Sequence, residues 1–311
     1  MSPKLAAFYD AAALQSLKTS LLATILAAEN GMEIKEVTKK ADSFLSTHEL
    51  RELYIEIEKH KIGASRQEFR RNAYLANMLK KDELQLTEYQ NIALSSHARF
   101  FYCDKTNAHE KCLIIFFSCA GGMIGMGNCL FLSKLPLNRC DVLFLNRHRH
   151  YDYRYGVPGI GEGIVDTCLK LQEILSSERY AGVCCIGFSM GGLWALRTAI
   201  LMNTSIGVAL SGTFAIKKRE DSPFDNDIEY DPLSEYSNVS SAKLFCFHSE
   251  HSKRDADDAL KFQELFPRTK LKVLEAAKEH NIFALLSAQR KLDTFLSEMV
   301  HGTIYPEELS W

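Results

Sequence analysis

The sequence has almost no excess of positive or negative charge, because it contains 37 lysines and arginines and 39 aspartates and glutamates. A formal net charge of −2 gives no general attraction to nucleic acid or to a membrane surface, so neither is an expected partner. The chain also lacks a C-x-x-C pair or a Cys/His array that would bind zinc. Its nine cysteines are irregularly spaced, which indicates reduced thiols in a cytoplasmic protein without a metal site.

One uncharged stretch, residues 112–133, is long enough to cross a bilayer. It contains four glycines and an asparagine, and it divides into a strand, a loop and a helix. That composition argues against a membrane-spanning helix. We therefore expect no stable membrane insertion, in keeping with an apolar content of 46% and a charged content of 24%.

Residues 1–95 have the pattern of helices without strands. Apolar side chains recur at helical spacing, and Ser46 and Glu49 form a capping box before one such run. The expected apolar stripes include Leu21, Ala41, Leu50 and Leu53. These features predict a small all-helical N-terminal module at 1–95, whose role stays open between partner docking, substrate recruitment and stabilisation.

From residue 96 to residue 311 the pattern changes to alternating strands and helices. The expected strands are 98–103, 112–117, 142–145, 180–186, 206–210, 244–247 and 271–274. Such alternation predicts an α/β domain with a mostly parallel sheet and helices on both faces. Active sites of such sheets lie beyond the carboxyl ends of the strands.

The most informative motif is Gly187-Phe188-Ser189-Met190-Gly191. An apolar, partly β-branched segment precedes it and an expected helix follows it, and this context is typical of a nucleophile elbow. The flanking glycines leave room for a strained serine turn packed between strand and helix. Ser189 is therefore the candidate nucleophile.

With this motif the chain resembles the α/β-hydrolase superfamily from about residue 98 to the end. The resemblance implies a serine hydrolase or acyltransferase, with nucleophile, acid and histidine in that chain order. It implies that His280, just past the last expected strand, is the general base. Ser252 stands where many members carry the acid, a departure from the family pattern. Asp255 is the preferred acid, because it comes just before the next expected helix and ahead of His280, and Glu250 is the alternative.

The same resemblance implies an oxyanion hole built from two backbone N–H groups. One belongs to Met190, the residue after the nucleophile. The other is expected from the glycine-rich segment after strand 112–117, at Gly121 or Gly122, although the histidine found there in relatives is missing.

A basic, tyrosine-rich segment follows the expected strand 142–145. Its residues Arg147, His148, Arg149 and Tyr151 suit an anionic or carbohydrate ligand, because arginine binds carboxylate or phosphate and tyrosine stacks on sugar rings. An exposed polar loop without a ligand is the alternative.

Three functions remain in view. The preferred one is carboxylic ester hydrolysis on a polar or carbohydrate-like small molecule, without a cofactor. The second is an O-acetyltransferase that moves acetyl from acetyl-CoA to a hydroxyl of an anionic polysaccharide, since the chain is similar in general plan to bacterial capsule O-acetyltransferases. The third is a non-catalytic binding protein with the same fold. The sequence leaves the acyl group, the acceptor and the oligomeric state open.

Overall fold

The structure is a computed structural model of the 311-residue chain. It describes residues 89–103, 107–119, 124–126, 128–136, 138–147, 153–176, 179–214, 239–275 and 280–309, together with isolated helical residues between 19 and 55. These residues are the described part of the chain.

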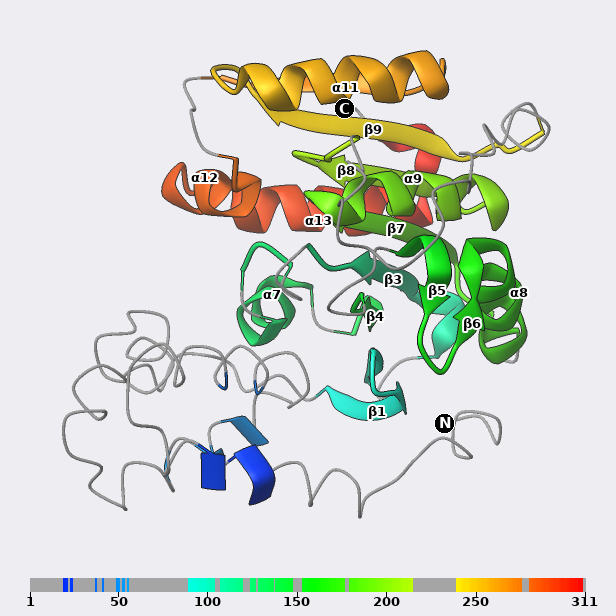
Figure 1. Cartoon of the computed structure of the whole chain (residues 1–311), viewed down its shortest axis with the longest axis vertical. Helices are drawn as coiled ribbons and strands as arrows, with labels where there is room; N and C mark the ends of the chain where they lie inside the picture. Colours follow the sequence, from blue (N-terminus) through cyan, green and yellow to red (C-terminus); the bar gives the residue numbers. More distant parts are fainter. Residues whose placement is uncertain are drawn as a thin grey trace, which may run out of the picture.

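A mixed sheet of eight strands forms the centre of the described fold, in the order β1-β2-β4-β3-β7-β8-β9-β10 (Figure 1). Its strands are β1 (Gln90–Ser95), β2 (Ala98–Tyr102), β3 (Cys112–Phe117), β4 (Cys140–Leu145), β7 (Gly182–Phe188), β8 (Ile206–Leu210), β9 (Lys243–Ser249) and β10 (Lys270–Leu274). Within this described sheet β2 pairs antiparallel with both neighbours, and the pairs from β4 to β10 are parallel. The predicted mostly parallel sheet is thus confirmed.

Helices cover both faces of the sheet, as the alternating pattern predicts. They are α7 (Asn128–Lys134), α8 (Gly163–Leu175), α9 (Met190–Leu201), α11 (Lys253–Leu265), α12 (Ile282–Ala288) and α13 (Leu292–Ile304). Three short 3-10 turns accompany them: η1 (Ala108–Glu110), η2 (Tyr153–Tyr155) and η3 (Pro306–Glu308). In Figure 1, α9 and α13 lie on opposite faces of the sheet around β7.

The two faces carry two separate apolar cores because side chains alternate along each strand. From β3, Ile115 and Phe117 pack with α8, α9 and α11, whereas Ile114 and Phe116 pack with α7, α12 and α13. Every residue of β3, β4 and β8 is buried. Strands covered on both faces form a rigid support for groups at their carboxyl ends.

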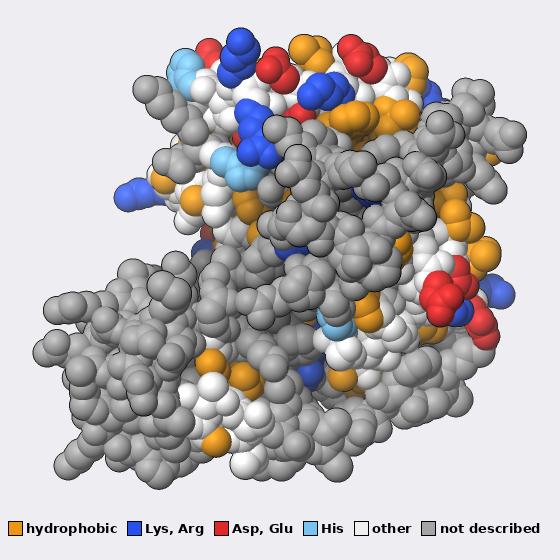
Figure 2. Space-filling view, in the orientation of Figure 1, with side chains coloured by type: hydrophobic (Ala, Val, Ile, Leu, Met, Phe, Trp, Pro, Cys, Tyr) orange, Lys and Arg blue, Asp and Glu red, His pale blue; other side chains and the backbone are white. Residues whose placement is uncertain are grey.

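Helix α11 shows the amphipathic pattern expected of a helix on the surface of a sheet. Ala259 and Phe262 are buried against the sheet, while its outer face carries acidic and basic side chains side by side. Figure 2 shows these charges of both signs over the uppermost helix. Asp255 and Asp258 are buried exceptions in this helix.

The prediction that the first 95 residues contain no strand is wrong at Gln90–Ser95, which forms β1. In this segment Ile92 and Leu94 are buried in alternation with the less buried Asn91, Ala93 and Ser95, the usual strand period. The sheet therefore begins before the predicted boundary at residue 95. The helix α13 and the two-stranded hairpin β5 (Gly156–Val157) and β6 (Gly161–Glu162) were also not predicted.

Parts of the predicted N-terminal stripes are described. Leu21, Ala41, Leu50 and Leu53 are helical and buried, as their spacing predicts. Beside them, Glu49 accepts a hydrogen bond from Asn91 Nδ2 at 3.2 Å and lies 3.9 Å from the buried guanidinium of Arg99. This helical segment therefore contacts the β1–β2 end of the sheet. The remaining residues of 1–88 lie outside the described part.

The uncharged stretch 112–133 divides as its glycines predict. Residues 112–117 form β3, and α7 begins at Asn128. Within the described ranges, we find no helix with the length and apolar character needed to cross a bilayer.

Candidate active site

Ser189 lies on a strained turn between β7 and α9. Its backbone angles, φ 52° and ψ −117°, are unfavourable for a residue with a side chain and cost about 1–3 kcal/mol. Three backbone hydrogen bonds hold this turn: Ser189 N–H donates to Leu210 C=O at 3.0 Å, and Ser189 C=O accepts from Gly192 at 3.0 Å and from Thr213 at 2.9 Å. The turn presents the serine hydroxyl beyond the carboxyl end of β7.

The two glycines of the motif are required by close backbone contacts. A Cβ at Gly187 would lie 2.1 Å from the carbonyl oxygen of Gly191, and a Cβ at Gly191 would lie 2.2 Å from that of Phe117. Both separations are far below contact distance, so strand β7, the first turn of α9 and the end of β3 can meet only without these side chains. The predicted reason for the glycines holds in the structure.

A continuous row of hydrogen bonds leads from Ser189 to a buried carboxylate. Ser189 Oγ lies 3.0 Å from His280 Nε2, and His280 Nδ1 lies 2.9 and 3.0 Å from the carboxylate oxygens of Asp255. An ionised carboxylate only accepts, so Nδ1 carries the proton and Nε2 accepts the hydrogen bond of the serine hydroxyl. Ser189, His280 and Asp255, which are distant in sequence, thus form one hydrogen-bonded relay.

Burial and charge act in opposite directions on the acid of this relay. Burial raises the pKa of Asp255, but hydrogen bonding to His280 and the electrostatic interaction with that ring lower it, so the pKa lies below its usual value. The Asp255 side chain is 3% exposed, whereas the His280 side chain is 46% exposed. The carboxylate therefore stays ionised inside the protein, while the imidazole faces outward.

The alternative acid lies elsewhere. Glu250 is half-exposed and 3.7 Å from His251. Asp255 lies in the first turn of α11 and not before that helix as its sequence context predicts, because the helix already begins at Lys253 after the cap position Ser252. The structure thus places Asp255, and not Glu250, against His280.

The sheet is parallel from β4 to β10, and β2 is antiparallel to both of its neighbours. A strained serine follows β7, an acid follows β9 and a histidine follows β10. All three side chains lie beyond the carboxyl ends of parallel strands, in the chain order serine, acid, histidine. The chain has the α/β-hydrolase fold.

Several solved structures resemble part of the chain at low sequence identity. MenH from S. aureus has a TM-score of 0.44 and 14% identity, and the match covers 69% of this chain and 100% of that one. Est1E from Butyrivibrio proteoclasticus has a TM-score of 0.44 and 11% identity, covering 68% and 98%. Esterase B from Lactobacillus rhamnosis has a TM-score of 0.48 and 12% identity, covering 82% and 97%. No protein-family model matches the sequence, and neither does any curated protein.

Within this α/β-hydrolase fold, the predicted oxyanion hole is described in part. Met190 is the first residue of α9, where a backbone N–H has no partner within the helix and the helix dipole favours negative charge. Gly121 and Gly122 lie outside the described residues. Ser118 and Cys119, just before them, follow directly from β3.

The basic segment after β4 is also described in part. Arg147 is half-buried, and His148, Arg149 and Tyr151 lie outside the described residues. Tyr153, two residues beyond Tyr151, is fully buried, so its ring does not face a ligand. Burial raises the pKa of its hydroxyl, and hydrogen bonds to Ser118 and the charge of Arg147 partly oppose this.

The structure adds residues around Ser189 and His280 that the sequence reasoning missed. Thr213 Oγ1 lies 3.4 Å from Ser189 Oγ, and the ring of Phe188 lies 5.4 Å from the imidazole of His280. Asn281 donates through Nδ2 to the carbonyl of Gly125 and caps α12 by accepting from Ala284 N–H at 3.1 Å. The position of Asn281, next to His280 at the start of an expected helix, indicates a helix cap. The Thr213 contact could not be predicted, because it depends on how β8 ends next to the elbow.

In the described parts of the chain, His, Cys, Asp and Glu side chains form no cluster of three or more that could hold a metal ion.

Proposed function

We propose that the protein is a serine-dependent acyl-transfer enzyme that hydrolyses carboxylic esters through an acyl-enzyme. The observation that carries this proposal is the relay Ser189–His280–Asp255, with distances of 3.0 and 2.9 Å, on a strained elbow. A serine with only a structural role does not require an unfavourable backbone conformation or a hydroxyl aligned with a histidine and a buried acid.

In the proposed first step, Ser189 Oγ attacks the acyl carbon while His280 Nε2 takes the hydroxyl proton. Asp255 remains ionised and stabilises the imidazolium through Nδ1–H. The ester C–O bond then breaks, and His280 returns the proton to the leaving alcohol. In the second step, water gives a proton to His280 and attacks the acyl carbon. The bond from that carbon to Ser189 Oγ then breaks, His280 returns the proton to Ser189 Oγ, and the acid is released.

The negative charge of the tetrahedral intermediate needs donors that are already in place. The N–H of Met190 at the start of α9 supports this role, since it lies next to the nucleophile and at the positive end of a helix dipole. The second donor is proposed from the segment that follows Ser118, where the sequence predicts Gly121 or Gly122.

A polar or carbohydrate-like substrate is proposed from the basic segment after β4. Arg147 supports this choice because it follows the carboxyl end of β4, the same edge of the sheet as Ser189. A guanidinium there favours esters that carry an anionic or hydrogen-bonding group.

The proposal is tested by p-nitrophenyl acetate hydrolysis with wild type, Ser189→Ala and Ser96→Ala. Ser96 is a matched control, because its hydroxyl also lies close to a histidine nitrogen, 2.8 Å from His97 Nδ1, but on the exposed turn between β1 and β2. We expect Ser189→Ala to lower kcat by more than roughly 1000-fold and Ser96→Ala to leave it unchanged. Equal rates in wild type and Ser189→Ala would contradict the proposal.

The same preparation distinguishes hydrolysis from O-acetyl transfer. A transferase would release CoA from acetyl-CoA only when a polysaccharide with free hydroxyls is added, and the polysaccharide would become acetylated. A hydrolase would release acid from the ester at the same rate with or without that acceptor.

A further inference from the structure

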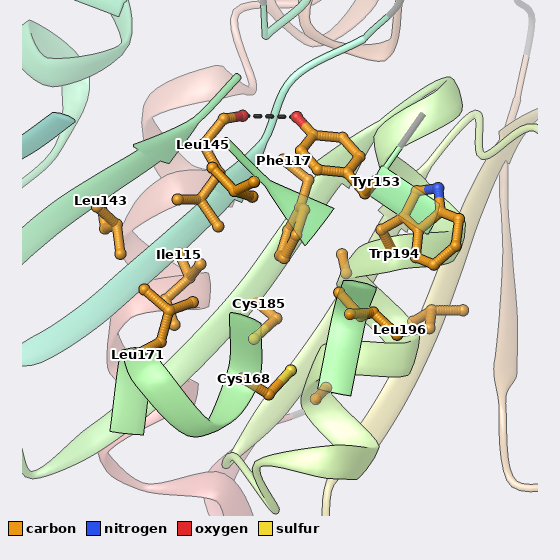
Figure 3. Close-up of a cluster of buried hydrophobic side chains, with 14 of the residues drawn as sticks. Ile115, Phe117, Leu143, Leu145, Tyr153, Cys168, Leu171, Cys185, Trp194 and Leu196 are labelled. Atoms are coloured by element: carbon orange, nitrogen blue, oxygen red, sulfur yellow. Dashed lines mark hydrogen bonds between the residues drawn. The ribbon is translucent and has the colours of Figure 1, made fainter. Parts of the chain in front are cut away.

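The end of β3 next to the nucleophile elbow is held by one buried tyrosine. Tyr153 is 0% exposed and comes from η2, and its ring packs edge-on against Phe117 at 5.0 Å. Figure 3 shows its hydroxyl directed at the carbonyl of Leu145, the last residue of β4. A tyrosine hydroxyl at this depth needs hydrogen-bond partners, and it finds them on two strands.

The hydrogen bonds around Tyr153 form a closed ring. The hydroxyl donates to Leu145 C=O at 2.6 Å, and the same carbonyl accepts from Ser118 N–H at 3.0 Å. Because the single tyrosine proton is used on Leu145, the Ser118 hydroxyl donates back to the tyrosine oxygen at 3.0 Å. Ser118 is itself 0% exposed, so water does not compete for these bonds.

The first turn of α9, just after the nucleophile elbow, contacts the backbone that takes part in this ring of hydrogen bonds. A Cβ on Gly191 would lie 2.2 Å from the carbonyl oxygen of Phe117 and 2.9 Å from that of Ser118, so the first turn of α9 touches this backbone. Met190, the proposed oxyanion donor, is the residue immediately before that contact. Any displacement of the Ser118 peptide would therefore also displace the first turn of α9.

We propose that Tyr153 is a positioning residue for acyl transfer: its hydroxyl, bonded to Leu145 and Ser118, fixes the backbone that contacts the first turn of α9, where the proposed oxyanion donor Met190 lies. This inference rests on the proposed function. Hydrogen-bond donors stabilise a developing negative charge much less when they are slightly displaced. We therefore expect loss of the Tyr153 hydroxyl to lower kcat more than it weakens substrate binding.

The chain offers a close control for this role at the other end of β4. Tyr89 is also buried, and its hydroxyl donates to the carbonyl of Cys140, the first residue of β4, at 3.0 Å. Tyr153→Phe and Tyr89→Phe each remove one buried tyrosine hydroxyl from a carbonyl of the same strand. Only the first lies beside the elbow.

The test compares both variants with wild type in p-nitrophenyl acetate kinetics, in the rate of labelling by a fluorophosphonate and in urea unfolding. We expect Tyr153→Phe to lower kcat and the labelling rate by roughly 10-fold or more with KM nearly unchanged, and Tyr89→Phe to leave kcat, KM and the labelling rate unchanged. Both variants should lose similar stability. Should Tyr153→Phe not fold, Ser118→Ala opens the same ring from the other side and should give the same change in kcat.

Two results would overturn the inference in distinguishable ways. If wild type is active and Tyr153→Phe keeps the wild-type kcat and labelling rate, or loses them only in proportion to its folded fraction, the positioning role is wrong while the proposed function stands. If folded wild type neither hydrolyses the ester nor is labelled, the proposed function is wrong, and this inference fails with it.

Discussion

At the scale of single residues, the site depends on a backbone conformation that Ser189 would not adopt by itself. Its positive φ is maintained by hydrogen bonds to Leu210, Gly192 and Thr213, which belong to three different segments. The strain persists because these surroundings over-determine it, a pattern typical of functional turns. The hydrogen bond from His280 Nδ1 to Asp255 fixes the orientation of the imidazole, as the proposed mechanism requires.

The acid is the residue whose role is tested most simply. We expect Asp255→Asn to lower kcat for p-nitrophenyl acetate by roughly 1000-fold or more, because an amide can leave His280 in the wrong tautomer. Glu250→Gln is the matched control, since Glu250 is half-exposed and lies beside His251. A larger loss in Glu250→Gln than in Asp255→Asn would contradict this assignment.

The lowered pKa of Asp255 also predicts a dependence of stability on pH. The folded state favours the ionised carboxylate, so its contribution is fully present above the unfolded value of about pH 4 and is lost as the pH falls through the lower folded value. We expect the difference in free energy of unfolding between wild type and Asp255→Asn to shrink below about pH 4. Urea unfolding over this pH range measures it, and a constant difference would argue against the prediction.

At the scale of elements, α12 begins directly after the proposed base. Asn281 caps it through Ala284 N–H, and its amide also reaches the carbonyl of Gly125 in the segment after β3. The beginning of this helix therefore connects the His280 turn with the segment that follows β3.

We expect Asn281→Ala to lower the free energy of unfolding by about 1 kcal/mol, because the N-cap is lost. Asn281→Ser retains an oxygen that can cap α12 and should recover most of that stability. Urea unfolding of both variants measures the difference. An equal loss in the two would show that the cap is not the cause.

Elements with a strong local pattern were predictable, and elements defined by distant partners were not. The elbow, the helix α9 after it and the strand β8 follow from apolar runs and glycines that lie next to one another in sequence. The strand β1 and the helix α13 carried readable periods of two and of three to four residues, and both were missed. The hairpin β5–β6 has only two residues in each strand, too few for any period.

The site divides in the same way. Ser189 and His280 follow from motif and chain order, and Asp255 from its place after a strand. Tyr153 could not be assigned from sequence, because its partners Leu145 and Ser118 are brought to it only when β3 pairs with β4.

At the scale of the whole molecule, the two ends of the parallel strands have different roles. The carboxyl ends carry the proposed relay, and the amino ends carry a buried ion pair. Lys111 Nζ donates to Asp141 at 2.9 Å and to the carbonyl of Cys103 at 2.6 Å, and Tyr180 donates to Asp141 at 3.0 Å. This network joins the amino ends of β3 and β4 to the chain that leaves β2 and the chain that enters β7.

This separation predicts that stability can be changed without changing the chemistry. We expect Lys111→Met to lower the free energy of unfolding by about 3–5 kcal/mol, because Asp141 is left buried and unpaired. Combining it with Asp141→Leu should recover part of the loss. The folded fraction of each variant should react with a fluorophosphonate at the wild-type rate, and a slower rate would contradict the separation.

The central claim, an activated Ser189, is tested most directly by intact mass and peptide mapping after fluorophosphonate treatment. The account predicts a single adduct, located on the peptide that contains Ser189, in wild type and in Ser96→Ala. It predicts no adduct in Ser189→Ala and sharply slowed labelling in His280→Ala. Folded wild type that stays unlabelled, or an adduct that persists in Ser189→Ala, would contradict it.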